Sequence, residues 1–307
     1  MLVKPIDISV VVPVYNEYES LPELEQWIDR VMKANKFSYQ LILIDDGSSD
    51  ESWEVIEQLI EKNDSVLGLR FRRNYGKSAA LHTGFKAANG EVVVTMDADL
   101  QDDINAIDGF LEKRAEGCDI VYGVRSSREK DTAFKRGTAQ GYYKILAKMG
   151  VEITYNHADY RLMSKRAVEG LAEFKEVNLF LRGLVPMVGY KSDIVTYVRA
   201  ERQAGESKYP LKKMISFAME GITSLSVKPI SFITALGVIV FLISLIILIG
   251  SIIAGNSASM TIIMASIWAL GGLQLAAIGI IGEYIGKIYL ESKARPKFII
   301  ETNLEEI

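Results

Sequence analysis

Residues 40–50 read Gln40-Leu41-Ile42-Leu43-Ile44-Asp45-Asp46-Gly47-Ser48-Ser49-Asp50, a short apolar run that ends in clustered carboxylates. A second stretch has the same design, with Glu91-Val92-Val93-Val94-Thr95-Met96 leading into Asp97-Ala98-Asp99-Leu100-Gln101-Asp102-Asp103. One Asp-Gly turn is ordinary turn chemistry. Two acidic strand ends favour a binding site, because open α/β sheets bind ligands at the carboxyl ends of their strands. Clustered carboxylates repel one another unless a cation lies between them, so the stretches predict a Mg²⁺ or Mn²⁺ site that serves a phosphate-bearing substrate.

The segments around these stretches alternate between strand and helix patterns. Short apolar runs predict strands at residues 8–14, 40–44, 66–71, 91–96 and 119–124. Apolar residues at helical spacing predict helices at 21–34, 52–62 and 77–88. This alternation predicts an α/β fold with a mainly parallel, doubly wound sheet. The sequence contains no Gly-x-x-x-x-Gly-Lys loop, which argues against a phosphate-loop NTPase.

The composition limits the classes to which the protein can belong. Its 307 residues are enough for one large α/β domain with an appendage. The formal net charge of −4 provides no overall basic field for binding nucleic acid. Cys118 is the single cysteine, so no internal disulfide can form, which fits a reducing compartment. The short N-terminal apolar run contains Pro13 and predicts a strand rather than a signal peptide.

Two segments in the second half of the chain carry no charged side chain. They are Phe232–Ala254 and Met260–Gly282, each 23 residues long. At about 1.5 Å per residue, a helix of this length crosses a hydrocarbon core of about 30 Å. A helical hairpin buried in a soluble core is the alternative, and two consecutive uncharged segments disfavour it. Lysine and arginine flank the pair on both outer sides, so the positive-inside bias predicts a multi-pass protein of the inner (plasma) membrane with a cytoplasmic N-terminal domain.

We therefore expect four regions: a catalytic domain at 1–210, a juxtamembrane helix at 211–229, a two-helix hairpin at 230–290 and a cytoplasmic tail at 291–307. The juxtamembrane segment follows Pro210 and has an apolar stripe with flanking lysines, which is typical of a helix lying in the membrane interface. Packing of this helix on the soluble domain is the alternative. Glycines such as Gly271, Gly279 and Gly282 allow close helix contacts, so we also expect a homo-oligomer.

Several motifs, in this order and spacing, resemble the inverting family 2 glycosyltransferases of GT-A fold. They are Val12-Pro13-Val14-Tyr15-Asn16-Glu17, Asp45-Asp46-Gly47-Ser48-Ser49-Asp50, Arg73-Asn74-Tyr75-Gly76-Lys77 and Asp97-Ala98-Asp99-Leu100-Gln101. The later Asp159-Tyr160-Arg161-Leu162 and the segment from Arg202 to Tyr209 resemble the polyprenyl-phosphate branch, which includes dolichol-phosphate mannose synthase. With the hairpin included, the chain is most similar to bactoprenol-phosphate glucosyltransferases.

The resemblance implies a role for individual residues. The nucleotide-sugar, a UDP-sugar in the first instance, would be held by Pro13, Tyr15, Glu17, Asp45, Asp46, Lys77 and Asp97. The ligands of Mg²⁺ or Mn²⁺ would be Asp97, Asp99 and Gln101. The acceptor's phosphate would be received by Arg125 and Arg136. The catalytic group would consist of Asp99 and Asp159 with Arg202 and Lys208, the last two clamping phosphate.

The implied reaction is inverting transfer of a hexose, glucose in the first instance, from the UDP-sugar to undecaprenyl or another polyprenyl phosphate. The product would donate sugar to cell-envelope glycosylation, with a flippase as a possible partner. The family offers Asp159 as a general base. A phosphate monoester has a second pKa near ~6 and is already anionic at neutral pH. We therefore interpret Asp159 as a residue that orients the acceptor or the sugar.

Other readings of the same motifs stay open. An acceptor lipid with a hydroxyl group, such as diacylglycerol, would make Asp159 an essential base. A membrane-tethered nucleotide-sugar binder that scaffolds a flippase would need no turnover, although the intact Asp97, Asp99 and Gln101 argue against a dead site. A processive polysaccharide synthase would carry a Gln-x-x-Arg-Trp segment, which this sequence lacks.

Overall fold

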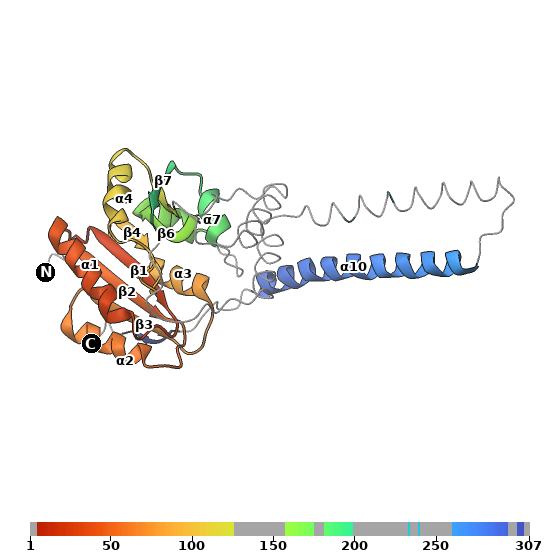
Figure 1. Cartoon of the computed structure of the whole chain (residues 1–307), viewed down its shortest axis with the longest axis horizontal. Helices are drawn as coiled ribbons and strands as arrows, with labels where there is room; N and C mark the ends of the chain where they lie inside the picture. The colour runs from red at the N-terminus through yellow and green to blue at the C-terminus, as the bar shows by residue number, and fades with distance from the viewer. Residues whose placement is uncertain are drawn as a thin grey trace. The chain divides into compact units, whose positions relative to one another are not determined.

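The computed structural model describes residues 5–125, 157–174, 181–198, 260–293 and 300–303, together with Ile233 and Ile239. The chain divides into two compact units. The first unit comprises residues 1–143, 152–209 and 296–307, and the second comprises residues 144–151 and 210–295. The described part of the first unit is a sheet covered by helices, and that of the second unit is mainly the long helix α10 (Figure 1).

The described residues of the first unit form an eight-stranded mixed sheet with the order β7-β5-β6-β4-β1-β2-β3-β8. The strands are β1 (Ile8–Val14), β2 (Tyr39–Asp45), β3 (Val66–Phe71), β4 (Val92–Thr95), β5 (Ile120–Arg125), β6 (His157–Ser164), β7 (Ser192–Tyr197) and β8 (Ile300–Asn303). Neighbours β4, β1, β2 and β3 are parallel, and so are β5 and β7. Strand β6 runs antiparallel between β4 and β5, and β8 runs antiparallel beside β3.

The five strands predicted from the sequence are confirmed to within one residue. Strands β1 to β5 and β7 run in the same direction, so the sheet is mainly parallel, but it is mixed because β6 and β8 run against the others. The sequence did not predict β6, for a local reason. This strand alternates charged residues such as Asp159 and Arg161 with apolar ones, so it lacks the continuous apolar run that marks a buried parallel strand. Strand β8 falls in the segment that the sequence assigned to a tail.

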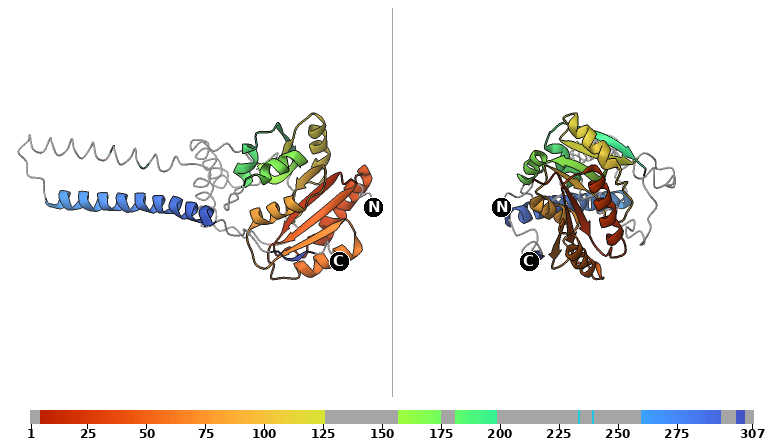
Figure 2. Two further views of the ribbon diagram at one scale, coloured as in Figure 1. Left: turned by 180° about the vertical axis from the view of Figure 1, so that it is seen from behind. Right: turned by 90° about the vertical axis from the view of Figure 1, so that its left-hand side faces the viewer.

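Helices cover both faces of this sheet (Figures 1 and 2). They are α1 (Leu21–Asn35), α2 (Ser52–Lys62), α3 (Lys77–Ala87), α4 (Ala106–Ala115), α6 (Lys165–Ala172) and α7 (Leu181–Met187). Buried side chains of α1, α2 and α4 join those of the central strands in one hydrophobic core. Helix α3 packs on the opposite face of β1 and β2, where Gly84 lies against Val11 and Ile44. The central strands are therefore buried on both faces, which explains their continuous apolar sequences.

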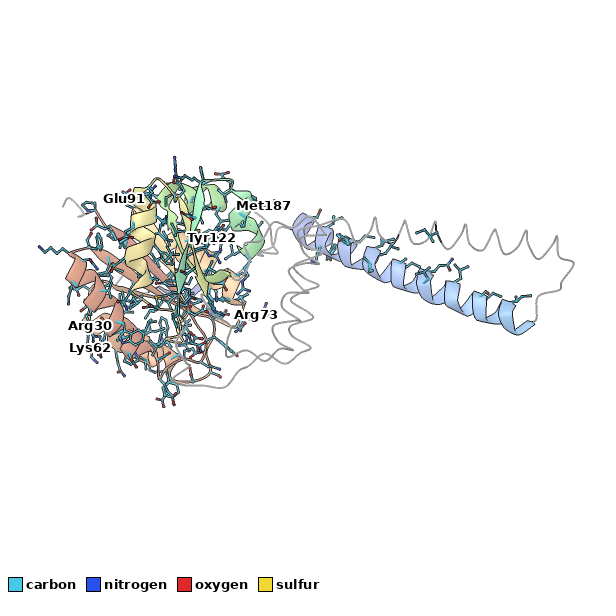
Figure 3. The ribbon with its side chains drawn as sticks, turned by 45° about the horizontal axis from the view of Figure 1, so that its top comes forward. Arg30, Lys62, Arg73, Glu91, Tyr122 and Met187 are labelled. Atoms are coloured by element: carbon cyan, nitrogen blue, oxygen red, sulfur yellow. The ribbon has the colours of Figure 1, made fainter. Side chains whose placement is uncertain are left out.

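Helix α1 shows how the sequence sets such a layer. Leu21, Leu24, Ile28 and Met32 recur at helical spacing and are buried against the sheet. A proline occupies the first turn, and the helix ends at Lys36, whose φ of 61° is left-handed. Charged side chains lie on the outer faces, as Figure 3 shows for α1 and α2.

The described part of the second unit is essentially helix α10 (Met260–Lys293), a continuous helix of 34 residues. It contains the uncharged segment Met260–Gly282. Among the residues that the structure describes, we find no helix with both the length and the apolar character needed to cross a membrane. The expected juxtamembrane helix at 211–229 lies outside the described residues, as does the first uncharged segment apart from Ile233 and Ile239.

The close contact between α3 and the sheet generates a stability prediction. A Cβ atom on Gly84 would lie 2.2 Å from Cγ1 of Val11 and 3.0 Å from Cδ1 of Ile44. We expect Gly84→Ala to lower the free energy of unfolding by about 1–3 kcal/mol, because a buried helix must shift to make room. Chemical denaturation monitored by circular dichroism measures the change.

Gly109→Ala in α4 is the matched control, because its Cβ would meet Cγ1 of the partly exposed Val195 at 3.1 Å, an overlap that a shift of a few tenths of an ångström relieves. Alanine stabilises a helix relative to glycine by about 1 kcal/mol, so this variant should lose no stability. Equal stabilities of the two variants would show that α3 does not pack as closely as described.

Candidate functional site

The carboxyl ends of β4, β1 and β2 lie side by side, because these strands are parallel neighbours. Val14 at the end of β1 pairs with Asp45, and Val11 of β1 pairs with Thr95 near the end of β4. The loops that follow the three strands therefore leave the sheet at one edge. The two acidic stretches meet at this edge, as the sequence predicts.

Asp45 lies at the base of this edge and is fully buried. Its Oδ1 accepts a hydrogen bond from the backbone N–H of Ser48 at 2.9 Å, and Arg70 Nε lies 3.5 Å from its Oδ2. Burial raises the pKa of this carboxyl group above its ordinary value. Oδ2 has no hydrogen-bond partner among the described residues, so Asp45 retains capacity to accept a donor.

Asp46 holds the neighbouring loop in place. Its two carboxylate oxygens accept the backbone N–H groups of Tyr75 and Gly76 at 2.7 and 2.9 Å. Burial raises the pKa of Asp46 to about 6. The adjoining Gly47 has a φ of 69°, and a Cβ there would lie 2.4 Å from the backbone of Arg73. Asp46, which the resemblance implies for nucleotide-sugar binding, is thus engaged with the segment that leads to Lys77.

The loop after β1 is tied to the loop after β2. Asn16 has a left-handed φ of 55°, and its Oδ1 accepts the N–H of Ser49 at 2.9 Å. The N–H of Glu17 donates to Oγ of Ser52 at 3.0 Å. Pro13 at the end of β1 is partly exposed, and Tyr15 in the loop after it is exposed. Five of the residues implied for the nucleotide-sugar therefore lie at the ends of β1 and β2 or in the loops that follow, whereas Lys77 begins α3 and Asp97 follows β4.

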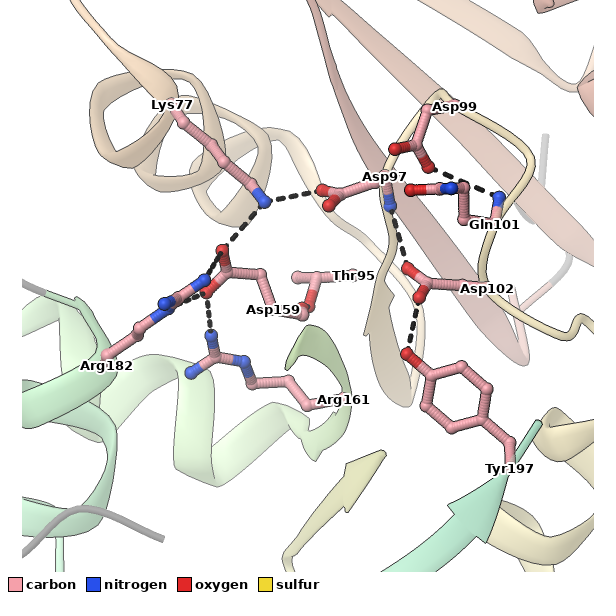
Figure 4. Close-up of polar contacts among 10 residues, drawn as sticks. All are labelled: Lys77, Thr95, Asp97, Asp99, Gln101, Asp102, Asp159, Arg161, Arg182 and Tyr197. Carbon is pink, nitrogen blue, oxygen red and sulfur yellow. Dashed lines mark hydrogen bonds and ion pairs between the residues drawn. The ribbon is translucent and has the colours of Figure 1, made fainter. Parts of the chain in front are cut away.

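The loop after β4 brings the three implied metal ligands close together (Figure 4). The N–H of Gln101 donates to Oδ1 of Asp99 at 3.2 Å, and Leu100 between them has a left-handed φ of 56°. The N–H of Asp97 lies 3.4 Å from Oδ2 of Asp102, which is buried. The loop thus turns back on itself and holds Asp97, Asp99 and Gln101 on one side.

This donor set fits a small divalent cation. Across the part of the chain that the structure describes, no group of three or more His, Cys, Asp or Glu side chains is arranged to hold a metal ion. Asp97 and Asp99 nevertheless provide two partly exposed carboxylates, and Gln101 adds an amide. Mg²⁺ is usually held by one or two carboxylates together with water and substrate phosphates. The residues therefore fit Mg²⁺ or Mn²⁺ shared with a phosphate-bearing ligand.

Asp159 is surrounded by three cations. Lys77 Nζ lies 2.7 Å from its carboxylate, Arg161 Nη2 lies 2.8 Å away and Arg182 Nη2 lies 3.1 Å away. Burial alone would raise the pKa of Asp159, but the three cations hold it well below its usual range. Asp159 therefore stays ionised at neutral pH and is a poor acceptor for a proton.

Lys77 connects Asp159 to the metal-ligand loop. Its Nζ donates to Asp97 at 2.5 Å as well as to Asp159 (Figure 4). Burial opposes the charge, yet the two carboxylates hold the pKa of Lys77 above its ordinary value. Lys77 begins α3 directly after the loop fixed by Asp46. The sequence places Lys77 with the nucleotide ligands, and the structure places it between Asp97 and Asp159.

Arg125 ends β5 on the far side of β6 from β4. Its Nε is buried and has no hydrogen-bond partner among the described residues. Burial disfavours the charge, but Tyr197, Asp102 and Asp97 hold the pKa of Arg125 above its ordinary value. Tyr197 donates its hydroxyl to Asp102 at 2.5 Å, which connects β7 to the metal-ligand loop.

The other predicted cationic residues, Arg136, Arg202 and Lys208, lie outside the described residues.

Sequence reasoning gave no role to Arg161, Arg182 or Tyr197, all of which contact the acidic groups of this edge. A signal existed for one of them. Arg182 is an isolated charge in the apolar run Leu179-Phe180-Leu181-Arg182-Gly183-Leu184-Val185-Pro186-Met187. A lone charge in such a run indicates either a buried pair or a binding site.

A solved structure shares this fold. Mannosyl-3-phosphoglycerate synthase from Rubrobacter xylanophilus aligns with 70% of this chain and 71% of its own, with a TM-score of 0.50 and 15% sequence identity. At this identity the likeness concerns the fold alone, a GT-A-like α/β domain with a mixed sheet.

Sequence comparison gives the family. The model of glycosyl transferase family 2 matches residues 9–171, more than half of the chain. The uncharacterized glycosyltransferase YkoT of Bacillus subtilis is 48% identical over 97% of this chain and 92% of its own length. The bactoprenol glucosyl transferase of Shigella phage SfV is 40% identical over 97% of this chain and 99% of its own. The chain belongs to glycosyl transferase family 2.

Proposed function

We propose that this protein transfers a hexose, with glucose as the first candidate, from a UDP-sugar to undecaprenyl or another polyprenyl phosphate, with inversion at the anomeric carbon. The product is a polyprenyl-phosphate sugar for cell-envelope glycosylation. Similarity to the bactoprenol glucosyl transferase of phage SfV and to a prophage homologue in Escherichia coli strain K12, both 40% identical, supports this proposal. The similarity extends over at least 96% of this chain, so it includes the C-terminal segments.

The protonation state of Asp159 is the observation that favours a phosphate acceptor over a hydroxyl acceptor. A hydroxyl acceptor needs a base to remove its proton. Asp159 occupies the position that the family offers for this base, but Lys77, Arg161 and Arg182 keep it ionised and engaged. A phosphate acceptor has a second pKa near ~6 and arrives largely deprotonated. An acceptor that needs no base therefore agrees best with the geometry.

On the donor side, the proposal assigns the nucleobase and ribose to Asp45 and to the loops that follow β1 and β2. Asp97, Asp99 and Gln101 hold Mg²⁺ or Mn²⁺, which when bound stabilises the negative charge that grows on the leaving diphosphate. Arg202 and Lys208 bind the donor phosphates, and Arg125 and Arg136 bind the acceptor phosphate. These four assignments rest on the resemblance of their motifs.

The acceptor's tail lies in a bilayer, so the proposal includes a membrane anchor. Its support is the printed sequence: two 23-residue segments without a charged side chain, flanked by lysine and arginine. In this proposal residues 230–290 form a transmembrane hairpin in the plasma membrane, 211–229 lie in the interface, and the catalytic domain is cytoplasmic. Anchoring confines the enzyme and its lipid acceptor to the same membrane, so they meet by diffusion in two dimensions rather than three. Homo-oligomerisation through the hairpin and a flippase partner belong to the same proposal.

The reaction class has a direct test. The purified full-length protein is given a panel of labelled UDP-sugars and undecaprenyl phosphate, with and without EDTA. We expect one donor to yield an acid-labile lipid product. EDTA should abolish its formation, and Mn²⁺ or Mg²⁺ should restore it, because two carboxylates and an amide hold the cation only weakly alone. Thin-layer chromatography of the lipid fraction measures the product.

Diacylglycerol and a nucleotide-only binding assay serve as controls. Transfer to diacylglycerol but not to undecaprenyl phosphate would support the hydroxyl-acceptor reading. Binding of a UDP-sugar without transfer to either lipid would support a scaffold.

A pair of variants tests the role of Asp159. We expect Asp99→Asn to lower kcat by roughly 100-fold or more, because it weakens the electrostatic stabilisation of the leaving group. Asp159→Asn should retain at least about ten times more activity, since the residue removes no proton in a step of this class. Initial rates at saturating donor and acceptor measure the effect.

Thermal unfolding and UDP binding must accompany these rates, because Asp159 is the counter-ion of the buried Arg161. Equal loss of activity in both variants, with unfolding temperature and UDP affinity unchanged, would contradict this role for Asp159.

A further inference from the structure

We infer that Arg182 is a further substrate-binding residue, whose guanidinium is held in place by Asp159 and contacts the phosphate of the acceptor. The inference rests on the proposed function and extends it to a residue on α7 that lies outside the motifs of the family resemblance.

The first argument is the distribution of charge around Asp159. Lys77, Arg161 and Arg182 bring three positive charges to this one carboxylate. Figure 4 shows the carboxylates of Asp97, Asp99 and Asp102 on the opposite side of Asp159 from Arg182. Positive charge therefore gathers on the Arg182 side of Asp159, where an anion would be attracted.

The second argument is that Arg161 and Arg182 bind the same carboxylate but differ in exposure. Arg161 is 2% exposed, and its contact with Asp159 at 2.8 Å already provides the buried carboxylate with a counter-ion. Arg182 adds two further bonds to the same carboxylate, from Nε at 3.2 Å and from Nη2 at 3.1 Å. Its side chain is nevertheless 46% exposed. Asp159 therefore orients a guanidinium that is about half exposed and can be reached by a ligand.

Arg161 provides an independent sign of a missing polar group. Its Nε and Nη1 are buried and have no hydrogen-bond partner among the described residues. Buried donors of this kind are rare in native proteins and call for an explanation such as a ligand or an ordered water. An anion next to Arg182 would place acceptor oxygens, directly or through water, in the neighbourhood of these donors.

The location of Arg182 favours contact with the acceptor rather than with the donor. The loops implied for the nucleotide follow β1 and β2, on one side of Asp97. Asp159 lies on β6, on the other side of β4, and Figure 4 shows Arg182 approaching from beyond Asp159. Arg125, implied for the acceptor phosphate, ends the next strand, β5. The planar fork of an arginine matches the oxygens of a phosphate, so Arg182 suits this anion.

The test uses the full-length protein with Arg182→Gln and Arg182→Lys. We expect Arg182→Gln to raise KM for undecaprenyl phosphate by roughly 10- to 100-fold, which is the effect of losing one charge-assisted hydrogen bond. Arg182→Lys should recover part of this loss, because it keeps the charge without the fork. The Kd for UDP should stay within about two-fold in both variants, since the nucleotide lies on the other side of Asp97.

Arg166→Gln is the matched control. Arg166 on α6 also forms a two-point pair with a buried aspartate, Asp119, with Nε 2.6 Å from Oδ1. Its side chain is exposed to a similar degree, and it lies outside the cluster around Asp159. If Arg182 had only a structural role, like Arg166, both Gln variants would change the unfolding temperature and neither would change KM for the lipid.

A second measurement does not depend on the Gln variant. Farnesyl phosphate in detergent should inhibit transfer by the wild-type protein, and its inhibition constant should rise in Arg182→Lys, whereas inhibition by farnesol should not change. Unchanged KM and inhibition constants in the Arg182 variants would overturn the inference while leaving the proposed function intact. A wild-type protein that binds UDP but transfers sugar to no polyprenyl phosphate would instead remove the proposed function on which the inference rests.

Discussion

Repulsion between carboxylates is the constraint on which the arrangement of this domain depends. The order β6-β4-β1-β2 brings six aspartates to one edge of the sheet: Asp45, Asp46, Asp97, Asp99, Asp102 and Asp159. Each buried member meets a different kind of partner. Asp46 accepts two backbone N–H groups, Asp102 accepts the hydroxyl of Tyr197, and Asp159 binds three cations. Asp97 and Asp99 are left partly exposed, and they are the pair that suits a divalent cation.

These partners also divide the site into two halves. Asp45 and Asp46 organise the loops on the β1–β2 side, and Asp159 organises two arginines on the β6 side. Lys77 is the link, because one ammonium group contacts both Asp97 and Asp159. The reaction proposed above joins a nucleotide-sugar to an anionic acceptor, so two negatively charged substrates must approach one another. Positive charge between them lowers that repulsion.

Much of the fold could be predicted from the sequence. The apolar runs of β1 to β5 and the helical spacing of residues such as Leu24 and Ile28 are local signals, and the structure agrees with them. Strand β6 was missed because Asp159 and Arg161 interrupt the apolar pattern. Their burial depends on the ion pair between them and on the contacts of Asp159 with Lys77 and Arg182. Ion pairs of this kind depend on β4, α3 and α7 together. No periodic pattern within a single segment of the sequence can therefore reveal them.

The sequence by itself determined which strand ends carry carboxylates, because an apolar run followed by acidic residues predicts both the strand and its exit. It also determined the family motifs around Asp45 and Asp97. The tertiary structure alone decided how each carboxylate is compensated. Arg182 lies 23 positions from Asp159 in the chain and Lys77 lies 82 positions from it, yet both contact its carboxylate. The protonation state of Asp159 is set by those distances, since electrostatic interaction depends on separation in space and on burial rather than on separation along the chain.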